Sequence, residues 1–530
     1  MLNMKKCLLN ILLGMLLVSC SISPVSRKQK KQNNERPNII MIMVDDLGYS
    51  DLGCYGGEIS TPNIDKLADQ GLRFAQFHNT AKCFSSRASF LTGLYQHQVN
   101  MSVMHDYLKN CVTIGEVLHD AGYRTLMVGK HHGKDNMYDR GFDRYFGLRD
   151  GACNHFNPGE QREGESKPGR KGWKRAWCID SVSYLPYTPK EKDFYTTDYF
   201  TKMAINYLEE YKNEDKPFFL YAAYTAPHDP LMAWPRDINK YLGKYMNGYE
   251  AIRKARYEKQ NRLGIVDETF PLSDPVYERW DLLSHNEKLT RDSLMATYAA
   301  MIDCLDQNIG KLINKLQELD VLENTLIMFV SDNGCQSSTW KRVFQYNTQN
   351  HSIGTIGSYT SLNMSWANVS NTPYRYFKKD AHEGGVCTPF IVHWPAKMSQ
   401  FKKGINLNYP GHLFDIMPTL IDVTGAKYPA LYKGDSIPEL VGESLLSVWE
   451  GKKLRREKPI FWQYGQGKGV RVGDYKLVSS NEATWELYNM NLDKTETNNL
   501  FEVETEKAAE LQTMYEEWWK VMMPQREICN

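Results

Sequence analysis

The chain has 530 residues, with 64 Lys and Arg against 63 Asp and Glu, so its formal net charge is only +1. This length is enough for one large core or for two domains. A nearly neutral chain has no overall field that attracts polyanions, so nucleic acid is not an expected partner, and an anionic ligand would need a local cluster of charges.

The first 20 residues have the pattern of an export signal. Two lysines precede an apolar run from Leu8 to Val18 that is too short for a comfortable membrane span. The run ends in Leu-Val-Ser-Cys, which resembles a bacterial lipobox, where cleavage leaves Cys20 as a lipidated first residue. We therefore expect a lipoprotein signal peptide over 1–20, a flexible polar tether over 21–36, and an exported protein with a lipid anchor in a membrane, in the periplasm or at the cell surface. An ordinary secreted protein with an incidental Cys20 is the alternative.

Apolar runs that alternate with amphipathic segments predict an α/β fold for residues 37–455. Strands are predicted at 38–44, 72–77, 123–128, 218–224, 325–330 and 390–393. Helices are predicted from Pro62, from Cys83 to a stop at Gly93, over 112–121 and over 292–316. Strands alternating with helices indicate a large, mixed, mostly parallel sheet covered by helices on both faces.

The last part of the chain has a different pattern. Short apolar runs at 460–462, 470–472, 475–478 and 485–488 are separated by turn residues, and a helix is predicted from about 504 to 520. This predicts a small antiparallel sheet with a helix, in a C-terminal subdomain over 456–530. The boundary is placed in 453–459. Residues 158–174, rich in Gly and charged side chains, are interpreted as a surface loop insertion.

Polar side chains follow two of the predicted strands directly. Asp45 and Asp46 come after the first strand, and Asp332 and Asn333 come after the strand over 325–330. In open α/β sheets, ligands bind at the carboxyl ends of the strands. Three carboxylates and one amide oxygen suit Ca²⁺ or Mg²⁺. The alternative for either pair alone is a turn or a helix cap.

The segment from Cys83 to Gly93 combines a cysteine at a helix N-terminus with Arg87 one turn later on the same face. This pattern resembles the signature of the sulfatase family, in which the cysteine is oxidised after synthesis to formylglycine. The family most often has Pro or Ala where this chain has Ser85. This difference could affect which maturation enzyme accepts the chain. The alternative is a buried structural cysteine. The resemblance implies an alkaline phosphatase-like fold and a sulfatase-maturating enzyme as a partner.

Further segments, in order, resemble the same family from about Pro37 to Met490. Lys130 and His132 match its Gly-Lys-Trp-His segment, with His131 in place of the aromatic residue. His228 lies between prolines after the strand over 218–224, and Lys378 lies four residues before a histidine, as the family's second sulfate-binding lysine does; Lys379 is its neighbour. The closest likeness is to the bacterial branch that acts on carbohydrates.

The resemblance implies roles for these residues. Asp45, Asp46, Asp332, Asn333 and the formylglycine oxygen at residue 83 bind a divalent cation, usually calcium and less often magnesium. A hydroxyl of hydrated formylglycine attacks sulfur, and the sulfate is then expelled. Arg87 orients the hydrated group. Lys130, Lys378 and His228 bind the sulfate, with His228 as general acid assisted by Lys378, and His132 acts as the later general base.

The resemblance also limits the substrate and leaves two alternatives. We expect sulfate esters of carbohydrates, taken from chain ends of host glycans such as mucin O-glycans or glycosaminoglycan fragments, with sulfated galactose as one candidate. A phosphate or phosphonate ester hydrolase of the same superfamily is one alternative, and an inactive lipoprotein that binds sulfated glycans is the other. The candidates for a sugar pocket are His97, His105, Arg149, His155, Trp234 and Tyr464. Relatives commonly have a Glu-His-like pair where this chain has Gln463 and Tyr464, so a relative's specificity should not be transferred.

The 11 cysteines do not specify a disulfide framework. Removal of Cys7, lipidation of Cys20 and oxidation of Cys83 would leave eight, and eight cysteines allow 105 pairings. No CxxC or HxxxH spacing indicates zinc.

Overall fold

The computed structural model describes residues 36–104, 106–169, 174–344, 351–401, 404–480 and 484–528. The expected signal peptide and nearly all of the expected tether lie outside these ranges. Residues 37–530 form a single compact unit, and the boundary expected at 453–459 stays a prediction. Among the described helices, none combines the length and the apolarity needed to cross a bilayer.

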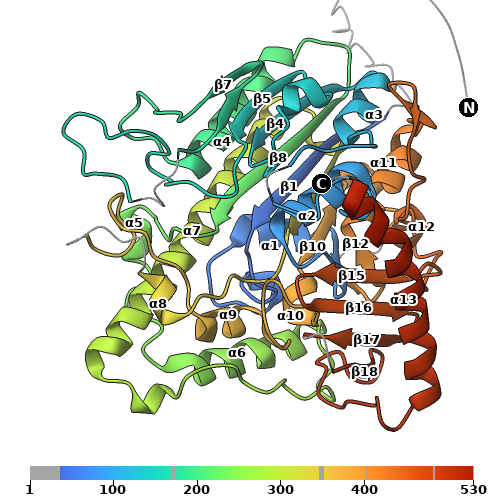
Figure 1. Ribbon diagram of the computed structural model, residues 1–530. Coiled ribbons are helices and arrows are strands. Elements are labelled where there is room, and N and C mark those ends of the chain that lie inside the picture. The colour runs from blue at the N-terminus through green and yellow to red at the C-terminus, as the bar shows by residue number, and fades with distance from the viewer. Residues whose placement is uncertain are drawn as a thin grey trace, which may run out of the picture. The chain divides into compact units, whose positions relative to one another are not determined.

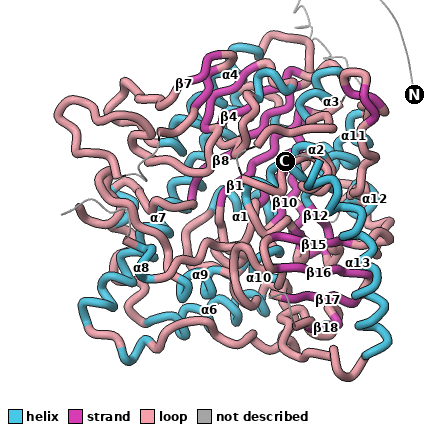
Figure 2. The backbone as a smooth tube through the Cα atoms, in the orientation of Figure 1, coloured by secondary structure: helices cyan, strands magenta, loops and turns pink. Residues whose placement is uncertain are grey.

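A ten-stranded mixed sheet forms the centre of this unit (Figures 1 and 2). In spatial order the strands are β11 (Ile405–Leu407), β2 (Leu72–Phe74), β10 (Phe390–His393), β9 (Thr325–Ser331), β1 (Asn38–Asp45), β8 (Phe218–Pro227), β4 (Arg124–Gly129), β5 (Arg144–Leu148), β6 (Trp177–Ile179) and β7 (Val182–Tyr184). The pairs from β9 to β5 are parallel, whereas β10, β6 and β7 run antiparallel to their neighbours. The predicted mixed, mostly parallel sheet is confirmed.

Helices cover both faces of this sheet, and the alternation of side chains along β1 shows how. Ile40, Ile42 and Val44 pack in the core that contains α1 (Pro62–Asp69), α4 (Thr196–Tyr211) and α7 (His285–Glu318). Ile39, Met41 and Met43 pack in the opposite core, with α2 (Cys83–Thr92), α3 (Ile114–Asp120), α11 (Ile416–Thr424) and α12 (Leu446–Trp449). A central strand buried on both faces explains the continuous apolar run in the sequence.

Several element boundaries differ from the expectation, and for three of them the structure gives a physical reason. The long helix α7 begins seven residues earlier than predicted, because Ser284 and Glu287 form a capping box at its start. Helix α3 begins at Ile114, since Thr113 is its N-cap. The strand predicted over 72–77 is two strands: β2 joins the large sheet, while β3 (Phe77–His78) pairs with β12 (Gly411–His412).

The C-terminal antiparallel sheet is confirmed. It has the order β15 (Ile460–Tyr464), β16 (Gly467–Val472), β17 (Tyr475–Ser479) and β18 (Glu486–Asn489). Helix α13 (Thr505–Ile528) lies along one face of this sheet (Figure 1) and packs Leu511 and Tyr515 against Val470, Leu477 and Leu487.

The remaining elements are short or peripheral. The other α-helices are α5 (Pro235–Ile238), α6 (Gly248–Arg262), α8 (Trp340–Val343), α9 (Met364–Ser370) and α10 (Glu383–Val386). The hairpin of β13 (Leu431–Tyr432) and β14 (Asp435–Ser436) is separate from the larger sheets. The 3₁₀ turns are η1 (Gly53–Tyr55), η2 (Met137–Arg140), η3 (Trp280–Leu282), η4 (Leu322–Asn324), η5 (Pro395–Lys397) and η6 (Leu413–Asp415).

Candidate active site

The two polar pairs predicted at strand ends lie side by side. Strands β1 and β9 are parallel neighbours with Val44 opposite Ser331, so Asp45 and Asp46 end level with Asp332 and Asn333. All four side chains are at most 1% exposed. The Asn333 Nδ2 donates to Asp46 Oδ1 at 2.6 Å, and the Asp46 backbone N–H donates to Asp332 Oδ1 at 3.3 Å.

This cluster has the donor atoms that a hard divalent cation needs. The Asp45 Oδ1, Asp46 Oδ2 and Asn333 Oδ1 atoms are buried and accept no hydrogen bond from any described residue. Ligand atoms of Asp45, Asp332 and Cys83 lie within 4.8 Å of one another. Buried oxygens are rarely left without a donor or a metal. The residues present therefore fit a calcium or magnesium ion held by oxygen ligands.

Helix α2 places Cys83 and Arg87 against these carboxylates. Cys83 is the first residue of the helix and is fully buried, and Gly93 ends the helix with a φ of 70°. One turn after Cys83, the Arg87 guanidinium donates to Asp332 Oδ2 at 2.8 Å and to the Lys130 carbonyl at 2.9 Å. Burial opposes ionisation of the Cys83 thiol, but the neighbouring Lys130 and Lys378 outweigh it and lower its pKa to about 6.

Lys130 and His132 directly follow strand β4 and lie at the site, as the resemblance implies. The Lys130 Nζ lies 2.5 Å from Asp45 Oδ2. His132 lines the cleft described below and its ring meets that of Phe84 edge-on, with centroids 5.7 Å apart. Gly151 allows this placement, because a Cβ at that position would lie 2.5 Å from His132 Nε2. The neighbouring His131 faces Asp135 at 3.7 Å instead.

His228 follows strand β8 and bridges two carboxylates. Its Nε2 lies 3.4 Å from Asp46 Oδ2, and its Nδ1 lies 2.8 Å from Asp229 Oδ1. Burial disfavours the charged ring, but Asp46, Asp45 and Asp229 together raise the pKa of His228. The buried ring of His155 is a support that the sequence did not reveal, since its Nε2 is 3.1 Å from the His228 carbonyl.

Of the two adjacent lysines, Lys378 is the one in the cluster. Its Nζ is hydrogen-bonded to Asp46 Oδ1, its backbone N–H donates to the Cys335 carbonyl at 3.1 Å, and it is only 3% exposed. Although burial acts against its charge, Asp46 raises the pKa of Lys378 well above its usual value. Lys379 is exposed and lines the cleft.

A cleft of about 680 Å³ opens above Cys83. Its walls come from several loops, and its lining residues are Lys82, Cys83, Phe84, Ser102, Val103, Met104, His132, Gly151, Ala152, Arg175, His228, Asp229, Gln336, Arg342, Lys379, Tyr464 and Gly465. The cleft therefore gives a ligand access to the cysteine and to both histidines assigned from the sequence.

Only one of the candidates for a sugar pocket lines this cleft, namely Tyr464. His97 packs on the rings of Trp518 and Trp519, and Trp234 donates from its indole N–H to Asp198. His155 has the supporting role given above, Arg149 is absent from the cleft walls, and His105 lies outside the described residues. Lys82, Arg175, Gln336 and Arg342 also line the cleft and were missed: Lys82 and Gln336 lie beside predicted motifs without belonging to them, and Arg175 and Arg342 come from segments without such a motif.

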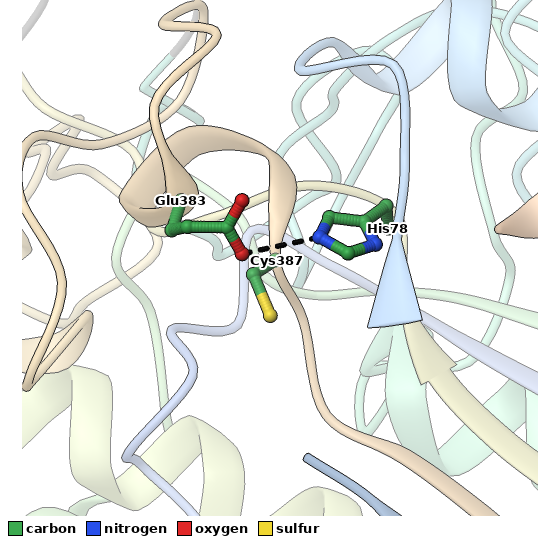
Figure 3. A group of neighbouring side chains, drawn as sticks. All are labelled: His78, Glu383 and Cys387. Carbon is green, nitrogen blue, oxygen red and sulfur yellow. Dashed lines mark hydrogen bonds and ion pairs between the residues drawn. The ribbon is translucent and has the colours of Figure 1, made fainter. Parts of the chain in front are cut away.

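A second group of possible metal ligands, His78, Glu383 and Cys387, is an ion-pair network (Figure 3). The His78 Nε2 lies 3.1 Å from Glu383 Oε2, and its Nδ1 lies 3.0 Å from the Gly411 carbonyl. The ammonium of Lys476 lies 2.6 Å from Glu383 Oε1, so both carboxylate oxygens of Glu383 are engaged, unlike Asp45 Oδ1 and Asp46 Oδ2 in the first cluster. This group therefore joins α10 to strands β3 and β17 and does not fit a metal.

The fold and site together define a class of protein. A mixed sheet with carboxylates at the ends of β1 and β9, and a cysteine at a helix N-terminus beside lysines and histidines, is the arrangement of an alkaline phosphatase-like hydrolase that acts on anionic esters.

Comparison with known proteins identifies the family. The model named Sulfatase matches residues 37–426, and the model named N-sulphoglucosamine sulphohydrolase, C-terminal, matches residues 373–522. The chain belongs to the sulfatase family and is a sulfuric ester hydrolase.

Relatives of known name match over most of their length. An arylsulfatase of Klebsiella aerogenes is 31% identical, over 80% of this chain and 94% of its own. An N-acetylglucosamine-6-O-sulfatase of Bacteroides thetaiotaomicron is 25% identical, over 92% of this chain and 86% of its own. Among solved structures, Ps i-CgsB in complex with k-i-k-neocarrahexaose has a TM-score of 0.66 at 24% identity, over 91% of this chain and 93% of that chain, which supports the fold.

Proposed function

We propose that this sulfatase hydrolyses sulfate esters of carbohydrates, with formylglycine derived from Cys83 and a bound Ca²⁺. The observation that carries the proposal is the cluster at the floor of the cleft. There Asp45, Asp46, Asp332 and Asn333 converge beside Cys83, and cationic side chains surround them. Mg²⁺ suits the same oxygen donors but demands a stricter octahedral geometry.

Formylglycine and Ca²⁺ together would supply the nucleophilic hydroxyl, because a metal lowers the pKa of an oxygen bound to it. The chain's own residues prepare the site for that chemistry. Arg87 fixes Asp332 through its hydrogen bond of 2.8 Å and adds positive charge next to residue 83. The buried oxygens of Asp45, Asp46 and Asn333 that lack a donor would hold the ion.

The remaining site residues bind the sulfate group and move protons. Lys130 and Lys378 offer ammonium groups where negative charge develops on sulfate oxygens. His228 lies at the cleft wall with Asp229 on its Nδ1, so its Nε2 is positioned to protonate a leaving alcohol. His132, on the wall next to Phe84, is positioned to remove a proton in the step that releases sulfate.

We further propose that the enzyme removes sulfate from terminal sugars of host glycans, such as mucin O-glycans or glycosaminoglycan fragments, with sulfated galactose as one candidate. The similarity to an N-acetylglucosamine-6-O-sulfatase supports a carbohydrate substrate. Cys83 lines the cleft and is fully buried, and such a recessed nucleophile supports action at a chain end. The lipobox-like segment ending at Cys20 supports a lipoprotein in the periplasm or at the cell surface. A sulfatase-maturating enzyme would be a partner.

The test is sulfate release from a panel of singly sulfated sugars by protein co-expressed with a maturating enzyme. The panel covers galactose, N-acetylglucosamine, N-acetylgalactosamine and uronate disaccharides, together with the matching phosphate esters. Release from one sulfated regioisomer is expected, and Cys83→Ala or a chelator should abolish it. The matched variant Cys111→Ala, which removes a buried thiol outside the site, should keep it. Phosphate release without sulfate release, from protein whose peptide mass shows conversion of Cys83, would refute the proposal.

A further inference from the structure

The rim of the active-site cleft carries cations that lack ion-pair partners. Lys82, Lys379 and Arg342 all line the cleft, and none of them has a carboxylate within 4.0 Å among the described residues. The cations deeper in the site differ, because each of them contacts a carboxylate: Lys130 contacts Asp45, and Lys378 contacts Asp46. The rim cations are therefore not needed to neutralise the carboxylates at the floor.

The backbone brings two of these cations together. The Lys379 backbone N–H donates to the carbonyl of Ala81 at 2.9 Å, so the residue after Lys378 lies next to the residue before Lys82. Lys379 has a φ of 83°, in the left-handed region that favours glycine. A long cationic side chain is thus held at a position where a glycine would be less strained. Arg342 reaches the same cleft from helix α8.

The charges of these cations oppose one another. Burial lowers the pKa of Lys379, and Arg342 and Lys378 add to this effect. Like charges that are held close and partly out of water disfavour one another, and a bound anion relieves that repulsion.

The cleft wall offers almost no negative charge in return. Asp229 is the one carboxylate among the lining residues, and it is already engaged by the His228 ring at 2.8 Å and by the hydroxyl of Ser361. The sulfate to be cleaved would lie at the floor against Lys130 and Lys378. The scissile sulfate therefore does not neutralise the positive charges of the rim cations.

We propose that the substrate carries a second anionic group, a uronate carboxylate or a second sulfate, which Lys379 and Arg342 bind at the cleft rim with support from Lys82. This inference rests on the proposed carbohydrate sulfatase function and narrows it to polyanionic saccharides. Guanidinium and ammonium groups bind carboxylate and sulfate oxygens through charge-assisted hydrogen bonds. The rim cations are then specificity residues for the sugar next to the sulfated position.

The experiment uses matched saccharides that share the scissile sulfate. One has no other charge, the second has a further sulfate, and the third has a uronate in place of the neutral sugar. The kcat/KM of the matured enzyme for either dianionic compound is expected to exceed that for the singly charged one by at least about tenfold, the low end for hydrogen bonds to charged groups. The preference should shrink at about 1 M salt, where charges are screened beyond about 3 Å. Comparing kcat/KM for the two dianionic saccharides shows whether a second sulfate or a uronate carboxylate is preferred.

Variants test which residues are responsible. Lys379→Gln and Arg342→Gln should each lower the ratio of dianionic to singly charged kcat/KM several-fold. The control Lys341→Gln, an exposed neighbour of Arg342 that does not line the cleft, should leave the ratio unchanged. Equal kcat/KM for all three saccharides in the unaltered enzyme, or a ratio that both rim variants leave unchanged, would overturn the proposal.

A binding measurement separates this inference from the proposed function. Calorimetry with Cys83→Ala protein measures affinity for the same three saccharides without any turnover. A preference of about tenfold for the dianionic compounds supports the rim site even if no sulfate is released, in which case the proposed function alone fails. Equal affinities for all three overturn the rim site while sulfate release still supports the proposed function.

Discussion

Replacing Lys476 by methionine should destabilise the fold strongly, because this lysine neutralises two buried carboxylates. Its Nζ lies 2.6 Å from Glu383 Oε1 and 2.8 Å from Glu496 Oε1, and all three side chains are at most 1% exposed. Methionine has a similar volume but no charge. The variant therefore leaves two carboxylates buried without their cation, and His78 remains as the partner of one of them.

Removing one partner of a buried ion pair costs about 3–5 kcal/mol of the free energy of unfolding. The entropy of unfolding is about 2.1 cal/mol/K per residue, so this loss corresponds to a decrease in Tm of about 3–5 °C for a protein of this size. Scanning calorimetry with refolding controls measures both quantities. Lys507→Met is the matched control, since the Lys507–Glu510 pair is 36% and 52% exposed and should contribute less than about 1 kcal/mol.

A double variant makes the test specific. Adding Glu383→Gln to Lys476→Met removes one of the two buried carboxylates that lost their cation. Part of the lost stability should therefore return, with a coupling free energy of about 0.5–3 kcal/mol. The reasoning would be refuted by a Lys476→Met variant that loses no more stability than the control, or by effects of the two substitutions that simply add.

Three further results are expected. Lys378→Ala should lower kcat/KM for sulfate release by about 10²–10³, as loss of a group that neutralises transition-state charge does; because the variant also removes the buried partner of Asp46 and lowers Tm, a native circular dichroism spectrum at the assay temperature is the control for folding. Asn333→Ala should weaken Ca²⁺ binding at least about tenfold in calorimetric titration, and unchanged affinity would exclude the amide oxygen as a ligand. Burial acts against the charge of His382, but Glu496, Asp380 and Glu486 raise its pKa to about 9. Because the folded pKa is raised, the resulting stabilisation of up to about 3 kcal/mol is fully present below about pH 6.5 and is lost as the pH rises through 9. The decline in Tm between these pH values should be absent in His382→Gln.

The strand-end residues of the site could be predicted because they depend on local pattern. A parallel sheet places the carboxyl ends of its strands at one edge, so Asp45 and Asp332 are expected at the same edge once β1 and β9 are recognised as strands, whereas the pairing of these two strands is seen only in the structure. The position of Cys83 at a helix start followed from the polar and apolar residues around it. The roles of His132, His228 and Lys378 could be assigned only through the resemblance to the sulfatase family, because nothing in the local sequence distinguishes Lys378 from Lys379.

The rest depends on contacts between distant segments. The bond between Lys379 and Ala81 joins residues almost 300 positions apart, and the network of His78, Glu383 and Lys476 joins three regions of the chain. The split of the predicted strand over 72–77 also has a tertiary cause, because β3 pairs with β12, which lies more than 300 residues later in the chain. Periodicity and composition carry no information on such pairings.

The state of the thiols has a consequence for producing this protein. All eight described cysteines are free and buried, so no covalent crosslink holds these parts of the chain together. These parts of the chain are stabilised by packing and ion pairs, which do not depend on the redox potential of the compartment. Material made in a reducing bacterial cytoplasm should therefore reach the same Tm as material made in an oxidising one, and a reducing agent in the buffer should not lower it.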